Sequence, residues 1–139
     1  MIKILLTTHG SLCRGMLETL KIFAAEPGCV QAIPYYIQEE GWDADAEMAK
    51  FISGIQDDDT VLVFTDILWG SVNQKMVVEL GNRENVHIIT GLNLPLVLEL
   101  ISTSEDELTE ENIAQKVQDC QQSIVYMKRY EISYADGDE

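Results

Sequence analysis

The stretch IKILLTTHGS, residues 2–11, decides how the rest of the chain is interpreted. Its first five residues are mostly apolar and rich in branched side chains, which is typical of a strand covered on both faces in a parallel sheet. One of the two histidines of the chain, His9, follows this run after two threonines. We therefore expect a buried strand that ends beside an imidazole.

The residues that follow change from the spacing of a strand to the spacing of a helix. Ser11 is the predicted N-cap, and the sequence EPG at residues 26–28 is expected to end the helix. The apolar residues between these two signals recur at helical spacing: Cys13, Met16, Leu17, Leu20, Phe23 and Ala24. The chain therefore opens as a strand, a turn and a helix.

The same alternation continues, which sets the expected fold class. The further predicted elements are strands at residues 30–37, 60–64 and 86–90, a helix that Asp43 caps, and helices at 71–80 and 94–101. Pro34 weakens the second strand and places it near a sheet edge, because proline cannot donate a ladder hydrogen bond. This pattern predicts an α/β fold with a doubly wound, mainly parallel sheet in three layers and the strand order 2-1-3-4.

The C-terminal region is harder to interpret. A helix is expected near residues 111–121, and the following stretch SIVYMKRYEISYA is rich in β-formers but also compatible with helix. We favour an antiparallel strand within residues 123–134. The acidic end, residues 136–139, is expected to be a disordered tail. The length of 139 residues fits a single domain, residues 1–139.

Composition excludes several classes of function. With 9 Lys and Arg against 24 Asp and Glu, the formal charge is -15, so nucleic acid is not an expected partner. Three widely spaced cysteines fit neither a disulfide framework nor a zinc site and indicate a reducing cytoplasm. No apolar run approaches the ~20 residues that a membrane-spanning helix needs.

Two strand ends are expected to form the functional site. Ligands of such sheets bind outside the carboxyl ends of the strands, and the order 2-1-3-4 brings the first and third ends together, so His9 should meet Asp66. A carboxylate that holds one ring nitrogen fixes the tautomer and leaves the other nitrogen nucleophilic. Ser71 opens the next predicted helix, whose N-terminal N–H groups suit a phosphoryl group.

Each of these residues also has a structural interpretation. A histidine after a strand can be an ordinary loop residue, and an aspartate there can cap a helix; their convergence at one strand edge favours the functional interpretation. Gly10 allows close backbone approach or simply forms a turn. His87 lies within a strand without a predicted carboxylate beside it and is taken as structural. Trp69 either packs or contacts a protein partner.

Three motifs at neighbouring strand ends carry a family resemblance. They are T-H-G at residues 8–10, Asp66 followed by Gly70-Ser71, and G-x-N-x-P at residues 91–95. With these motifs the chain resembles the enzyme IIA component of the mannose-type sugar phosphotransferase system of bacteria. The likeness covers nearly the whole chain.

The resemblance implies a specific function. His9 would accept a phosphoryl group from the histidine phosphocarrier protein HPr and pass it to a IIB component, which serves the membrane subunits IIC and IID. Asp66 would orient the ring through Nδ1 and leave Nε2 as the phosphorylated atom, while Ser71, Gly70 and Gly10 bind the phosphoryl oxygens. No cofactor or metal is implied. The family forms cytoplasmic homodimers that exchange a C-terminal antiparallel strand.

The chain departs from the family pattern, and other functions stay open. Residues 72–74 are VNQ where relatives commonly have P-F-N, and residues 66–71 are DILWGS where D-T-W-G-G-S is common. A phosphorylation-sensing regulatory module and the dihydroxyacetone kinase phosphocarrier share the fold. A histidine phosphatase would need arginine at Thr8, and a flavodoxin-like FMN module uses a loop without histidine. The sequence does not identify the sugar.

Overall fold

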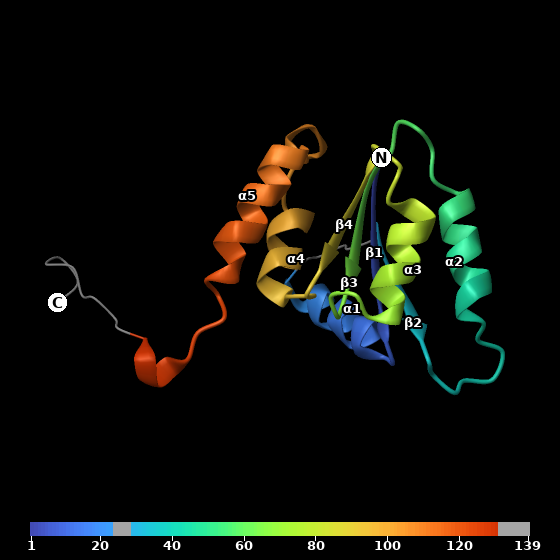
Figure 1. Cartoon of the computed structure of the whole chain (residues 1–139), viewed down its shortest axis with the longest axis horizontal. Coiled ribbons are helices and arrows are strands. Elements are labelled where there is room, and N and C mark those ends of the chain that lie inside the picture. The colour runs from blue at the N-terminus through green and yellow to red at the C-terminus, as the bar shows by residue number, and fades with distance from the viewer. Residues whose placement is uncertain (24–28, 131–139) are drawn as a thin grey trace, which may run out of the picture.

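The computed structural model describes residues 1–23 and 29–130, and within them four strands form one parallel sheet (Figure 1). The order is β2-β1-β3-β4, as predicted, and β2 with its Pro34 is an edge strand. The strands are β1 (Ile2–His9), β2 (Val30–Tyr35), β3 (Thr60–Thr65) and β4 (Val86–Thr90).

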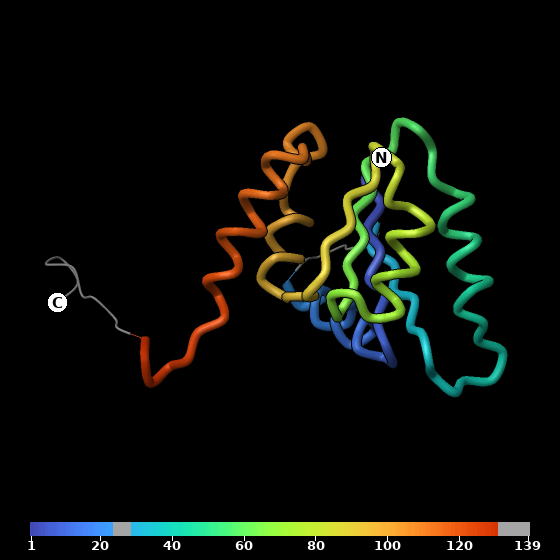
Figure 2. Tube along the Cα trace, in the orientation of Figure 1, coloured from blue at the N-terminus to red at the C-terminus, as the bar shows by residue number. Residues whose placement is uncertain are grey.

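Helices cover both faces of this sheet, so the α/β fold with helices between parallel strands is confirmed (Figure 2). One face packs against α2 and α3, and the other packs against α1 and α4, with α5 outside α4. The α-helices are α1 (Leu12–Phe23), α2 (Ala44–Ser53), α3 (Ser71–Leu80), α4 (Leu94–Ile101) and α5 (Glu110–Gln121). Two short 3₁₀ helices are η1 (Glu105–Glu107) and η2 (Met127–Arg129).

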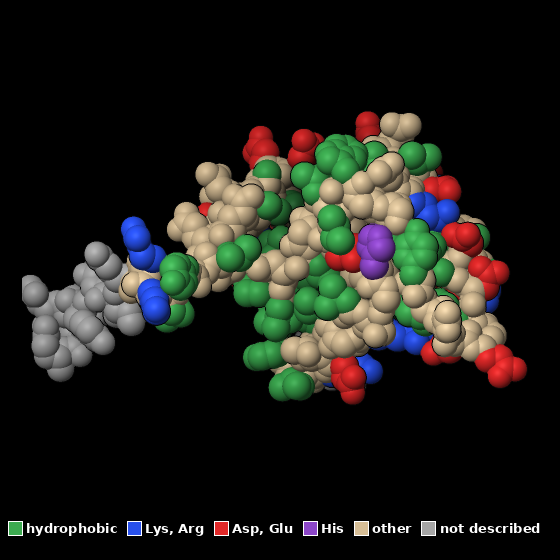
Figure 3. All heavy atoms as spheres, turned by 60° about the horizontal axis from the view of Figure 1, so that its bottom comes forward, with side chains coloured by type: hydrophobic (Ala, Val, Ile, Leu, Met, Phe, Trp, Pro, Cys, Tyr) green, Lys and Arg blue, Asp and Glu red, His purple; other side chains and the backbone are tan. Residues whose placement is uncertain are grey.

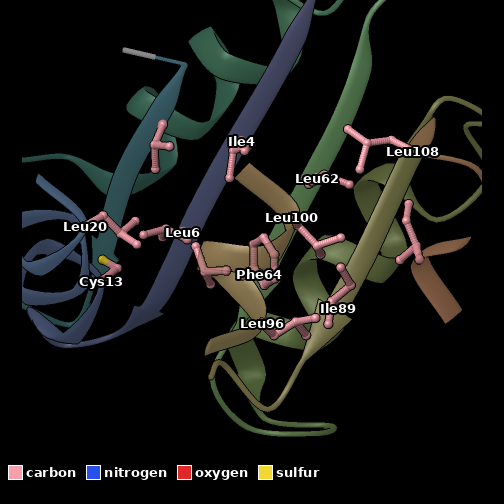
Figure 4. Packing of buried hydrophobic residues seen from close by; sticks show 13 residues of the cluster. Ile4, Leu6, Cys13, Leu20, Leu62, Phe64, Ile89, Leu96, Leu100 and Leu108 are labelled. Carbon is pink, nitrogen blue, oxygen red and sulfur yellow. The ribbon is translucent and has the colours of Figure 1, made fainter. Parts of the chain in front are cut away.

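Alternating side chains of the central strands form the two halves of the core. Leu5 of β1 faces α2 and α3, whereas Ile4 and Leu6 face α1 and α4, and all three are fully buried. Phe64 of β3 lies in the same half of the core as Ile4 and Leu6, between the sheet and the helices α1 and α4 (Figure 4). Burial on both faces explains why these strands read as continuous apolar runs in the sequence.

The first helix begins directly after Ser11, whose carbonyl accepts the first helical hydrogen bond from the Gly15 N–H at 3.1 Å, so Ser11 holds the predicted N-cap position. The side-chain cap comes from Thr8 instead, whose Oγ1 accepts a hydrogen bond from the Cys13 N–H at 3.0 Å. Gly10 adopts φ +66°, a left-handed conformation that turns the chain back and lets the Thr8 hydroxyl reach the helix. This turn ends β1 with His9 at the strand edge.

The C-terminal strand expected within residues 123–134 is not observed over its described part. Residues 123–130 leave the body of the molecule after α5 and contain only the turn η2 (Figure 1). A strand needs a neighbouring strand for its backbone hydrogen bonds, and this segment runs away from the sheet. Residues 131–134 and the expected tail at 136–139 lie outside the described residues.

No helix among residues 1–23 and 29–130 is long and apolar enough to cross a membrane.

Candidate functional site

The carboxyl ends of β1 and β3 bring His9 and Asp66 together, as the predicted strand order requires. The two strands are paired through Thr7 and Thr65, so the residues that follow lie side by side. His9 Nδ1 lies 3.0 Å from Asp66 Oδ2 and 3.2 Å from Oδ1. The backbone N–H of His9 also donates to Oδ2 at 2.9 Å. The carboxylate therefore holds both the backbone and the ring of His9.

Asp66 is charged at neutral pH. Its side chain is 9% exposed, and this burial alone would raise the pKa of the carboxyl. Hydrogen bonds from the backbone and ring of His9 together outweigh burial, and they hold the pKa of Asp66 below its usual value. An ionised carboxylate can only accept hydrogen bonds, so the proton of the neutral imidazole lies on Nδ1.

The other ring nitrogen faces the start of α3 and solvent. Ser71 Oγ lies 3.2 Å from His9 Nε2, and the His9 side chain is 36% exposed. Viewed from the carboxyl ends of the strands, a histidine side chain lies on the surface beside hydrophobic and acidic side chains (Figure 3). A half-exposed Nε2 with a fixed tautomer, whose only polar side-chain neighbour in the described chain is the Ser71 hydroxyl, is a nucleophile open to a partner.

The N-terminus of α3 lies beside this nitrogen. Its first helical hydrogen bond runs from the Gln74 N–H to the Gly70 carbonyl at 2.9 Å, so the N–H groups of residues 71–73 precede the helical ladder. Such groups and the helix dipole favour an anion. Ser71, Val72 and Asn73 thus offer backbone donors next to the position that a phosphoryl group on Nε2 would occupy.

The two predicted phosphoryl-binding glycines contribute space and shape. The Gly70 N–H donates to the Ile67 carbonyl at 3.0 Å, and the Gly10 N–H donates to the Tyr35 carbonyl at 2.6 Å. Both donors are therefore engaged within the fold. A Cβ at Gly70 would lie 3.3 Å from His9 Cε1, which is a tight contact, so glycine permits the close approach of α3 to the ring.

The third motif, residues 91–95, shapes the neighbouring loop. Asn93 caps α4 by accepting a hydrogen bond from the Leu96 N–H at 2.9 Å, and Gly91 adopts φ +82°. The Leu92 N–H donates to the Thr65 carbonyl at 3.0 Å, which ties this loop to the end of β3. These contacts support the site without reaching His9.

Residues 66–74, where the sequence departs from the family pattern, form a loop that is held by hydrogen bonds among its own residues. Trp69 adopts φ +60°, a conformation that costs a non-glycine residue about 1–2 kcal/mol. Asn73 Oδ1 accepts from the Trp69 N–H at 3.1 Å, and Gln74 Nε2 donates to the Trp69 carbonyl at 2.6 Å. Asn73 is buried and also donates to Thr65 Oγ1 at 3.0 Å. Asn73 and Gln74, two of the three residues that differ from the family pattern at positions 72–74, thus hold Trp69 in its strained conformation.

Tyr36 belongs to the site, although the sequence analysis did not single it out. Its ring stacks on the His9 ring with 5.3 Å between centroids and 24° between planes. Its hydroxyl lies 2.8 Å from Ser71 Oγ. The sequence offered a signal for this placement. Because β2 is parallel to β1 with Tyr35 opposite His9, the residue after Tyr35 must lie at the same carboxyl end of the sheet as His9.

His87 lies apart from this group on β4. Burial lowers the pKa of its imidazole, although the nearby charge of Glu110 acts in the opposite direction. A carboxylate is therefore close to His87, contrary to the sequence-based expectation. Within the described residues, no three His, Cys, Asp or Glu side chains are arranged to hold a metal ion.

Comparisons with known proteins identify the family of the chain. The family model described as the fructose IIA component of the phosphotransferase system matches residues 3–118. A Klebsiella pneumoniae structure, described as a putative phosphoenolpyruvate-dependent sugar phosphotransferase system permease, is 30% identical with a TM-score of 0.80 and covers 92% of both chains. A comparison with curated protein sequences gives no match.

Two further structures are similar. A Streptococcus pneumoniae IIA protein associated with a fucose utilization operon is 28% identical, with a TM-score of 0.74, covering 92% of this chain and 94% of that one. A mannose/sorbose-specific IIA subunit from Enterococcus faecalis, at 20% identity and a TM-score of 0.71, covers 94% of this chain and 98% of its own and shares the fold. The chain therefore belongs to the family of fructose IIA components of the phosphotransferase system, and it is a component of sugar phosphotransfer.

Proposed function

We propose that the chain is a phosphohistidine carrier that accepts a phosphoryl group on His9 Nε2 from phospho-HPr and passes it to a IIB component. The IIB component would then serve the membrane subunits IIC and IID from the cytoplasmic side. The observation that carries the proposal is the contact between Asp66 and His9 Nδ1 at 3.0 Å. This contact leaves Nε2 unprotonated and accessible beside the N-terminus of α3.

The transfer is a displacement at phosphorus. The lone pair of His9 Nε2 forms a bond to phosphorus while the bond from phosphorus to the donor's histidine nitrogen breaks, and that electron pair stays on the donor ring. Nδ1 keeps its proton throughout, and Asp66 stabilises the positive charge that the His9 ring gains. Ser71 and the N–H groups that begin α3 would hold the phosphoryl oxygens. Positioning and electrostatics supply the catalysis, without a cofactor.

The direct test is transfer of labelled phosphate from phosphoenolpyruvate through enzyme I and HPr to this protein. We expect an acid-labile, base-stable label, which is the signature of a phosphohistidine. Onward transfer to a IIB component distinguishes a carrier from a phosphorylation-sensing module, which would keep the label. A dihydroxyacetone kinase carrier would instead pass the label to its kinase. Failure of the wild-type protein to take up label would overturn the proposal.

Exposed apolar residues beside His9 fit a protein donor better than a small molecule. Ile67, Leu68 and Trp69 are 57%, 61% and 62% exposed, and they follow Asp66 directly in the chain. Side chains of this kind in one patch are typical of a protein interface. A partner that docks there brings its own phosphohistidine to Nε2.

Trp69 is expected to be a major contact of that docking surface. The variant Trp69→Ala should raise the KM for phospho-HPr about tenfold while kcat stays near the wild-type value. Steady-state transfer kinetics would measure both constants. The control is Ile22→Ala, which also removes an exposed apolar side chain but lies in the last turn of α1, at the end of the helix opposite to His9. An unchanged KM for Trp69→Ala would exclude this role.

The C-terminal segment supports a homodimer. Residues 123–130 extend from the body (Figure 1), and large apolar side chains of this short segment are exposed together, among them Ile124, Tyr126, Met127 and Tyr130. A run of this kind is typical of an interface. Within the described residues, β4 pairs only with β3, so its outer edge offers a second subunit unpaired backbone groups. We infer that this segment is exchanged between two copies and adds a strand there.

A truncated chain tests the dimer. The full chain is expected to sediment as a dimer, and a chain that ends after Gln122 is expected to sediment as a monomer, because it lacks the exchanged segment. Sedimentation equilibrium at tens of micromolar protein would separate the two states. A monomeric full chain, or a truncated chain that stays dimeric, would contradict strand exchange.

A further inference from the structure

Tyr36 is the one aromatic side chain in contact with the His9 ring among the described residues. We propose that Tyr36 is a positioning residue for phosphoryl transfer, acting through Ser71: its hydroxyl donates to Ser71 Oγ and thereby aims the Ser71 proton at His9 Nε2 and then at the arriving phosphoryl oxygens. The inference rests on the proposed function of His9. It adds a residue that none of the three family motifs contains.

The donor and acceptor of each hydrogen bond between Asp66, His9, Ser71 and Tyr36 can be assigned in turn, starting from the Asp66 carboxylate. The Asp66 carboxylate only accepts, so His9 Nδ1 donates to it and Nε2 of the neutral ring is an acceptor. Ser71 Oγ, 3.2 Å away, must therefore donate its single proton to Nε2. Its oxygen can then only accept from the Tyr36 hydroxyl, at 2.8 Å. The four groups form one chain with a single consistent set of donors.

The ring of Tyr36 also limits how His9 can move. The stacked arrangement, with 5.3 Å between ring centroids, covers one face of the imidazole. Asp66 fixes one edge of the same ring through Nδ1. Contacts at a face and at an edge leave Nε2 pointing in one direction, which is the condition for an in-line approach of phosphorus.

The loop that follows Tyr36 is tied to α1 and to β2. Tyr36 itself is 69% exposed and has φ +61°, so neither burial nor backbone preference favours its conformation. Arg14 of α1 binds Glu39 with two hydrogen bonds of 2.8 and 3.1 Å and lies 4.8 Å from the centroid of the Trp42 ring. Trp42 Nε1 donates to the Pro34 carbonyl at 2.9 Å. These contacts tie the loop after β2 to α1 and to its own strand.

Phosphorylation changes what Ser71 must do. Once Nε2 is bonded to phosphorus it has no lone pair left, so the Ser71 proton has to turn to a phosphoryl oxygen. A hydroxyl that already accepts a hydrogen bond from Tyr36 is a stronger donor, because linked hydrogen bonds polarise one another. It is also restricted in rotation about its own C–O bond. Tyr36 therefore acts on the transfer itself rather than on the docking of the partner.

A double-mutant cycle isolates this effect. Tyr36→Phe keeps the ring and removes only the hydroxyl, and we expect it to lower kcat for transfer from phospho-HPr about fivefold with KM unchanged. In a Ser71→Ala background the same change should have no further effect, because the group through which Tyr36 acts is gone. Circular dichroism would establish that all four proteins are folded.

Tyr35→Phe is the matched control. It removes a hydroxyl from the neighbouring tyrosine, whose hydrogen bond goes to Asp45 at 3.2 Å and not to the site, so kcat should not change. The inference is overturned if Tyr36→Phe leaves kcat unchanged, or if it lowers kcat equally with and without Ser71. If the wild-type protein takes up label and Tyr36→Phe gives either of these results, only the inference about Tyr36 is overturned. A wild-type protein that takes up no label overturns the proposed function as well.

Discussion

The His9→Gln protein is expected to take up no label from phospho-HPr under conditions that label the wild-type protein fully. The amide nitrogen of glutamine has no available lone pair for attack on phosphorus, whereas Nε2 of the Asp66-bound ring does. The substitution should leave the fold intact, because the His9 side chain is 36% exposed and lies outside the two buried clusters. Gel autoradiography after transfer, with thermal unfolding alongside, measures both effects.

The second histidine of the chain provides the control. His87→Gln removes an imidazole from β4. His87 is paired with Leu62 inside the sheet and not at the carboxyl ends of β1 and β3, so this protein should be labelled like the wild type. Label on His9→Gln, or loss of label on His87→Gln alone, would assign the phosphoryl group to a different residue.

The sequence predicted the fold because the strands are buried on both faces. Continuous apolar runs such as TVLVF at residues 60–64, separated by amphipathic helices, leave few arrangements besides a parallel sheet. The contact between His9 and Asp66 then followed from strand order alone. The spacing of apolar residues and the preference for right-handed crossover connections were sufficient to predict the sheet and this contact, because both depend on regular strands and helices.

The features that the sequence analysis missed depend on loop conformation. Tyr36 and Trp69 both have positive φ, which non-glycine residues seldom adopt and which no apolar periodicity encodes. Ser11 holds the N-cap position, but the side-chain cap of α1 comes from Thr8, because Gly10 reverses the chain between Thr8 and the helix. The contacts that fix these loops, such as those of Asn73 with Trp69, become visible only in three dimensions.

The C-terminal segment illustrates a different limit. A run of β-formers indicates that residues 123–130 can pair as a strand, but pairing also needs a free edge within reach. In the described chain β4 has an unpaired edge, but residues 123–130 run away from the sheet and do not reach that edge (Figure 1). A run of β-formers alone therefore does not determine whether a segment becomes a strand.

The Asp66→Ala protein is expected to transfer phosphoryl groups about 10–100-fold more slowly than the wild type, but not to lose transfer, since Nε2 is still present. That range is the one found when the hydrogen-bonding partner of a metal-ligating histidine is removed, and Asp66 holds His9 through the same kind of contact. Without the carboxylate, the ring can rotate and can carry its proton on Nε2, where it blocks attack. Initial rates of labelling measure the effect. The control Asp58→Ala removes an exposed negative charge elsewhere and should leave the rate unchanged.

The contribution of Asp66 to the stability of the protein is expected to depend on pH. Because the folded-state pKa of Asp66 lies below its usual value of about 3.9, its contribution to stability is present above that pH and is lost as pH falls through the lower folded-state pKa. The stability difference between the wild type and Asp66→Ala should therefore shrink as the pH falls below about 3.9, as denaturant unfolding at several acidic pH values would measure. A difference that keeps growing below that pH would mean that Asp66 is not held as a carboxylate, and an unchanged transfer rate would refute its orienting role.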